Sequence, residues 1–101
     1  MANRQFVVYS YKNAEVEHFR LGISVSKKVG KAVVRNRMRR VIKEVVRHLA
    51  PRIESQYDLV IVVRKAALDL DYDGVTKSLV HVLSKAQVLR KQKRSTTRTK
   101  G

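Results

Sequence analysis

The sequence has no cysteine, no tryptophan, a single proline and only four glycines. Without cysteine, a disulfide scaffold, a cysteine-ligated zinc site and a thiol nucleophile are all excluded. The chain also has neither an apolar run of about 18 residues nor the apolar segment of a signal peptide, so we expect no membrane span and a cytoplasmic location. Acidic residues are scarce too, because eight Asp and Glu stand against 23 Lys and Arg.

The length and net charge narrow the class of protein. The chain has 101 residues, of which 44% are hydrophobic, and a formal net charge of +15. This length suits one folded domain, which we expect over residues 1–90, followed by a basic and disordered tail, residues 91–101. A folded domain of this charge repels itself unless a polyanion neutralises it. Nucleic acid is therefore the expected partner, and an anionic membrane surface is the alternative.

The segment from Lys27 to Arg47 holds nine of the basic residues and one acid, Glu44. Residues 27–31 are expected to form a loop, and a helix is expected from about Ala32 to Leu49, since Pro51 ends it. At 100° per residue its apolar side chains form one stripe: Val34, Met38, Val41, Val45 and Leu49, with Ile42 at the margin. The other side carries Arg35, Asn36, Arg39, Arg40, Lys43 and Arg47.

This charge pattern indicates a binding surface rather than a solvated helix face. A solvated face normally interleaves glutamate with lysine four residues apart, and this face has Glu44 alone. Arginine also outnumbers lysine here, and its planar guanidinium makes two hydrogen bonds to one phosphate. No helix-turn-helix partner precedes the segment, which favours RNA over DNA.

Three β-prone segments surround this helix. Residues 6–11 and 18–25 alternate in character, with Phe19, Leu21, Ile23 and Val25 on one face of the second segment, and residues 12–17 are expected to form a hairpin loop. The continuous apolar run 57–64 predicts a strand that is buried on both faces. Tyr9 and Tyr11 either pack half-buried in the sheet or offer stacking surfaces for unpaired RNA.

The sequence contains few groups that suit catalysis or metal binding. Asp69, Asp71 and Asp73 precede a last helical pattern, where Asp71 suits an N-cap and Asp73 suits the positive end of the helix dipole; a Mg²⁺ site is the alternative. The histidines lack the spacing of metal ligands and are expected at the surface: His18, His48 and His81.

Residues 22–47, GISVSKKVGKAVVRNRMRRVIKEVVR, resemble the signature of the bacterial ribonuclease P protein subunit. The similarity continues in ANRQFVVY (2–9), in FRLG (19–22) and in YDGVTKSLVHVL (72–83). It therefore covers nearly the whole chain up to about residue 90.

The resemblance implies a fold and a function. The expected fold is α+β, a two-layer sandwich with helices packed on a central, mostly antiparallel sheet and a left-handed β-α-β crossover, similar to ribosomal protein S5 domain 2. The expected function is that of a noncatalytic, RNA-binding subunit of an endoribonuclease. Its partners would be a catalytic RNA, which removes the 5′ leader of precursor tRNA with its own Mg²⁺ ions, and the precursor tRNA itself. No cofactor is expected on the protein alone.

The resemblance also assigns residues to the two RNAs. The residues expected to bind the RNA subunit are Arg35, Asn36, Arg37, Arg39, Arg40, Lys43 and Arg47. Those expected to bind the precursor-tRNA leader are Val7, Tyr9, Tyr11, Arg20, Ser24, Lys27, Lys28 and Lys31.

One departure from the family pattern concerns the start of the chain. Family members normally begin with a further basic helix that forms one wall of the leader-binding cleft, and Met1 stands just after the place where that helix would end. From this we expect weaker leader binding, retained binding to the RNA subunit, and self-association through exposed strand edges.

Two other functions stay open on the sequence alone. One is a general RNA chaperone or ribosome-associated RNA-binding module, which would use the same basic helix without a defined partner. The other is a protein-only nuclease that uses the three aspartates.

Overall fold

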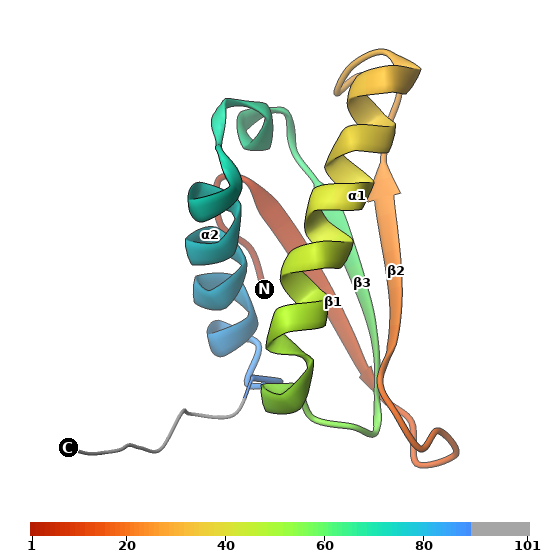
Figure 1. Cartoon of the computed structure of the whole chain (residues 1–101). Helices are drawn as coiled ribbons and strands as arrows, with labels where there is room; N and C mark the ends of the chain where they lie inside the picture. Colours follow the sequence, from red (N-terminus) through yellow and green to blue (C-terminus); the bar gives the residue numbers. More distant parts are fainter. Residues whose placement is uncertain (90–101) are drawn as a thin grey trace, which may run out of the picture.

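The computed structural model describes residues 1–89, so the predicted tail 91–101 lies outside the described part. The chain forms strands β1 (Phe6–Lys12), β2 (Arg20–Val25) and β3 (Tyr57–Val63), and helices α1 (Ala32–Leu49) and α2 (Tyr72–Lys85). Short 3₁₀ turns follow α1 and β3, namely η1 (Ala50–Arg52) and η2 (Lys65–Asp69). Both helices lie on one face of the sheet (Figure 1), which confirms the predicted two-layer α+β fold.

The sheet is mixed, with strand order β1-β3-β2. β1 pairs with β3 in the antiparallel sense and β2 pairs with β3 in the parallel sense. The sheet therefore has one pair of each kind, rather than the mostly antiparallel pairing expected. In Figure 1 the chain leaves the top of β2, descends through α1 on the near side and returns in β3 to the left of β2. This crossover is left-handed, against the usual rule.

The connection between β1 and β2 is not the predicted hairpin. β3 lies between these two strands, so residues 13–19 pass across the start of β3 instead of turning back on β1. The backbone N–H of Asn13 donates to the carbonyl oxygen of Gln56 over 2.8 Å, which fixes the loop there. The prediction was wrong because a later strand pairs with both segments, and local sequence carries no sign of it.

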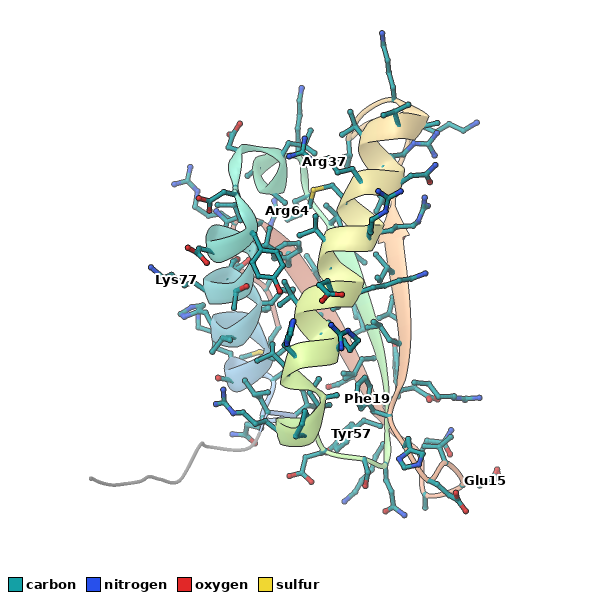
Figure 2. The ribbon with its side chains drawn as sticks, in the orientation of Figure 1. Glu15, Phe19, Arg37, Tyr57, Arg64 and Lys77 are labelled. Atoms are coloured by element: carbon teal, nitrogen blue, oxygen red, sulfur yellow. The ribbon has the colours of Figure 1, made fainter. Side chains whose placement is uncertain are left out.

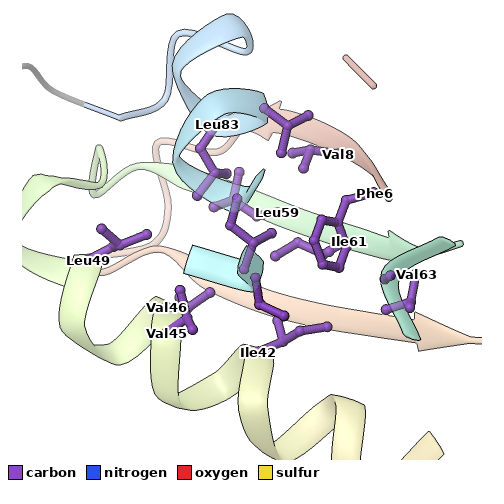
Figure 3. Packing of buried hydrophobic residues seen from close by; sticks show 14 of the residues in the cluster. Phe6, Val8, Ile42, Val45, Val46, Leu49, Leu59, Ile61, Val63 and Leu83 are labelled. Atoms are coloured by element: carbon purple, nitrogen blue, oxygen red, sulfur yellow. The ribbon is translucent and has the colours of Figure 1, made fainter. Parts of the chain in front are cut away.

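The core lies between the sheet and the two helices (Figure 3). Its sheet side is formed by Phe6, Val8, Val25, Leu59, Ile61 and Val63, and its α1 side by Met38, Ile42, Val45, Val46 and Leu49. Ile42 is completely buried at the centre of this stripe, whereas it was expected at the margin. Val34 and Val41 are half-buried, because they face a groove toward α2 rather than the sheet.

The end of α2 closes the core through a tight cap. Gln87 takes a positive φ of 61°; its N–H donates to the Ser84 carbonyl at 3.1 Å, and the Val88 N–H donates to the Leu83 carbonyl at 3.3 Å. This is a Schellman motif, and it turns Val88 into the core, where its side chain is fully buried. Leu89 then bridges to Ile53 beyond α1, a closure that the sequence patterns did not predict.

Candidate nucleic-acid interface

Within residues 1–89, no helix or strand covers the sheet face opposite the helices, and we call it the open face. The strand register aligns its side chains in three rows: Tyr11–Asp58–Arg20, Tyr9–Val60–Gly22 and Val7–Val62–Ser24. Val60 and Val62 are only half-buried here, so the prediction that the third strand is buried on both faces was wrong. A central strand between two partners needs apolar, β-branched residues even when a single face is covered.

The two tyrosines of β1 lie on this open face. Tyr9 is 49% exposed and Tyr11 is 58% exposed, so neither is a packed core residue. Gly22 stands in the same row beyond Val60 and has no side chain, so nothing projects from the β2 end of this row. Exposed aromatic rings on a flat sheet are the usual platform on which unpaired bases stack.

At one end of the open face, charges are paired within the protein. The Arg20 guanidinium makes two hydrogen bonds to Asp58, Nε to Oδ1 at 2.7 Å and Nη2 to Oδ2 at 2.9 Å. The Asn13 side-chain amide donates to the same carboxylate at 3.0 Å. The hydrogen bonds from Arg20 and then Asn13 lower the pKa of Asp58 from its ordinary value of 3.8 to about 2. Arg20 is thus on the predicted surface, but its charge is already matched.

The opposite end of the open face is basic and has no paired acid. Lys27, Lys28 and Lys31 are exposed in the loop between β2 and α1. Arg64 follows β3 directly at this end: its backbone N–H donates to the Gln5 carbonyl (2.8 Å), and its exposed side chain donates through Nη1 to the Asn3 carbonyl at 3.4 Å. Figure 2 shows Arg64 in the upper part of the molecule and Glu15 at the bottom. Arg64 was not among the predicted residues, although its place directly after the third strand was a usable signal.

Helix α1 starts within this basic end without help from a capping side chain. Its N-cap is Lys31, no side chain bonds to the free N–H groups, and no acid stands in the first turn. Lysines beside the positive end of a helix dipole are unfavourable for the protein alone. The arrangement concentrates positive potential at one place, where an anion would be stabilised.

The outward side of α1 carries most, but not all, of the predicted RNA-subunit residues. Five of them are exposed: Asn36, Arg37, Arg40, Lys43 and Arg47. Arg39 is half-buried and donates to the Asn36 side-chain oxygen at 3.3 Å, while Arg47 pairs with Glu44. Arg35 is half-buried as well, and its Nε is buried without a hydrogen-bond partner. Of the seven predicted residues, five are therefore exposed and two, Arg35 and Arg39, lie half-buried at the boundary of this surface.

The aspartates before α2 have a structural role. The Asp71 side chain accepts a hydrogen bond from the Gly74 N–H at 2.8 Å, and Asp73 lies in the first turn, so the capping interpretation is confirmed. In residues 1–89, no three His, Cys, Asp or Glu side chains are grouped so that they could hold a metal ion. The three histidines are exposed, as expected. Within the same residues, no helix is both long and apolar enough to span a membrane.

Comparisons with known proteins agree on one family. The model of the Ribonuclease P family matches residues 1–87. The ribonuclease P protein component of Listeria innocua serovar 6a is 47% identical over 91 residues, which cover 90% of this chain and 76% of the relative. The solved RNase P protein of Staphylococcus aureus superposes with a TM-score of 0.82 at 46% identity, covering 89% of this chain and 82% of that one. The RNase P protein of Thermotoga maritima gives a TM-score of 0.77 at 32% identity, covering 84% and 80%.

Proposed function

The chain belongs to the ribonuclease P protein family, and we propose that it serves this ribonucleoprotein by binding two RNAs on two separate surfaces. The outward side of α1 would bind the catalytic RNA subunit, through the predicted residues Arg35 to Arg47. The open face, with Lys27, Lys28, Lys31 and Arg64 at its basic end, would hold the 5′ leader of precursor tRNA.

The observation that supports this division is the position of the two surfaces in the two layers. α1 buries its apolar stripe against the sheet and turns Arg37, Arg40 and Lys43 outward. In the described part of the chain, these three cations have no protein partner, so they are free to bind phosphate. The open face belongs to the other layer. One molecule therefore offers both surfaces at once, and neither RNA has to displace the other.

We propose that the bond-breaking step belongs to the RNA partner and its Mg²⁺ ions. The side chains of the open face are aromatic rings, aliphatic groups, the Ser24 hydroxyl, and the Asp58 carboxylate, which is already bonded to Arg20 and Asn13. None of these pairs a nucleophile with a general base. The protein's contribution would be affinity and alignment, and it would be made in the cytoplasm, where transfer RNA is processed.

Reconstitution tests this function. Cleavage of precursor tRNA by a bacterial ribonuclease P RNA is measured at low Mg²⁺, with and without the protein. We expect the protein to accelerate cleavage, and to raise the affinity of the complex for precursor tRNA more than for mature tRNA, because only the precursor carries a leader.

The control is a cleavage reaction with the protein alone, which should give no product. Acceleration without any preference for the precursor would remove the leader-binding role and would favour a general RNA chaperone. Product from the protein alone would favour a protein-only nuclease.

Self-association is a further proposed property, and the strand edges bear on it. The outer edge of β1 is partly occupied, since Met1 and Val8 exchange backbone hydrogen bonds of 2.8 and 2.9 Å and Ala2 bridges to Val7. β2 is the other edge of the sheet. We expect the mass in light scattering to rise with protein concentration through β2 pairing. A constant monomer mass would exclude it.

A further inference from the structure

The open face is electrically divided along its length, and this division rests on Asp58. At one end, the charge of Arg20 is balanced by Asp58 in the same row, so this end of the face is neutral. At the other end, Lys27, Lys28, Lys31 and Arg64 stand with no acid beside them on that face. The tyrosine rings lie between the middle of the face and its neutral end.

Within the neutral end, Arg20 is held rather than free. Two of its nitrogens donate to Asp58, and Glu15 adds a further attraction, which together raise the pKa of the guanidinium. Asp58 is in turn fixed by Asn13, whose own side-chain oxygen accepts the Glu15 N–H at 3.0 Å. The guanidinium is therefore held against Asp58, which separates Arg20 from Tyr11 in the row, and its charge is balanced there.

We propose that the row Tyr11–Asp58–Arg20 is a nucleobase subsite for single-stranded RNA, while the phosphates of that RNA are bound only at the lysine end. Asp58 is the positioning residue: it keeps Arg20 from acting as a phosphate ligand and holds its guanidinium as a flat surface in the same row as the Tyr11 ring. Base stacking on tyrosine and on a guanidinium plane tolerates a neutral surface, whereas phosphate binding needs unmatched charge. This inference rests on the proposed function of the open face as the leader-binding surface.

Variants of the lysine end and of the Tyr11–Asp58–Arg20 row should differ in how strongly leader binding depends on salt concentration. Each phosphate contact on a single strand contributes about 0.7 to the slope of log K against log salt. Lys28→Gln should lower that slope by about 0.7, because an unpaired cation is lost. Arg20→Gln should weaken binding at every salt concentration with the slope unchanged. Asp58→Asn should raise the slope by about 0.7 and tighten binding at low salt, because it releases Arg20 to bind phosphate.

The experiment titrates a fluorescent precursor tRNA with the complex of the full chain and the catalytic RNA, and repeats the titration with mature tRNA. The difference between the two binding free energies is the contribution of the leader. The double variant Arg20→Gln with Asp58→Asn conserves net charge and should keep the wild-type slope. Circular dichroism melts show whether each variant is folded. If Asp58→Asn does not fold, Arg20→Gln still tests the subsite, because it leaves Asp58 unchanged.

A slope that falls for Arg20→Gln as much as for Lys28→Gln would overturn the subsite. An unchanged slope for a folded Asp58→Asn variant would do the same. If the proposed function itself is wrong, the result is different: the complex with the wild-type protein would bind precursor and mature tRNA with equal affinity at every salt concentration.

Discussion

Asp58 is the most perturbed titratable residue among those described, and its neighbours explain why. The carboxylate accepts hydrogen bonds from Arg20 and Asn13, and the pKa falls to about 2 because the charged form is the one that is bonded. Since the folded-state pKa lies below the ordinary 3.8, the folded state binds fewer protons than the unfolded state between these values.

This gives a prediction for acid stability. The contribution of Asp58 should be fully present above about pH 5, and it should be lost as the pH falls through 4 toward 2. Urea unfolding of the wild-type protein and of Asp58→Asn, followed from pH 6 to pH 2.5, measures it. The difference in unfolding free energy between the two should shrink as the pH falls. A difference that stays constant across this range would show that Asp58 does not titrate with folding.

At the residue scale, the sequence predicted which side chains share a face of the sheet, but it did not predict which charged side chains form ion pairs. The alternation in residues 6–11 and 18–25 placed Tyr9, Tyr11, Arg20 and Ser24 on one face, and the structure does so. The ion pair between Arg20 and Asp58 joins residues that are 38 positions apart in the sequence. No local pattern encodes such a contact.

At the scale of the elements, the C-terminal end of α2 holds one residue in a strained backbone conformation. Gln87 occupies the left-handed position of the Schellman motif, with φ of 61°. A residue with a Cβ is strained in this conformation by about 1–2 kcal/mol, whereas glycine is not.

Gln87→Gly should therefore stabilise the protein by about 1 kcal/mol, less the added entropy of glycine in the unfolded chain. Chemical denaturation measures the change, and Gln87→Ala is the matched control, since it shortens the side chain but keeps the Cβ. Equal stabilities for the glycine and alanine variants would contradict the strain argument.

Element boundaries followed well from local signals. α1 spans Ala32–Leu49 as predicted, because a strong apolar period ends at Pro51, and α2 starts after its predicted cap, Asp71. The hairpin and the doubly buried strand were wrong for a shared reason. Both depend on which strands become neighbours in the sheet, and that choice is made by residues far apart in the sequence.

At the scale of the whole molecule, exposed basic residues are spread over both helices of the helical layer. Arg37 and Arg40 project from α1, whereas Lys77 and Lys85 are exposed on α2 (Figure 2 labels Arg37 and Lys77). The two pairs carry the same charge, so they separate the effect of position from the effect of net charge.

Replacing Arg37 and Arg40 by glutamine should weaken binding to the RNA subunit and lower the salt slope by about one unit for each lost phosphate contact. Replacing Lys77 and Lys85 by glutamine is the control, and it should change the slope little. Filter binding over a range of monovalent salt measures both. Similar slopes for the two double variants would mean that net charge, and not the α1 surface, controls the affinity.

The central position of β3 has a consequence for how the chain acquires its structure during synthesis. β1 and β2 do not pair with each other, so neither has a partner until residues 57–63 have been made. By then the whole of α1 has already been synthesised, without the sheet that buries its apolar stripe. The sheet must form late and from distant segments, which slows folding. During that interval the nascent chain exposes Ile42 and its neighbours beside nine basic residues, in an environment rich in ribosomal RNA.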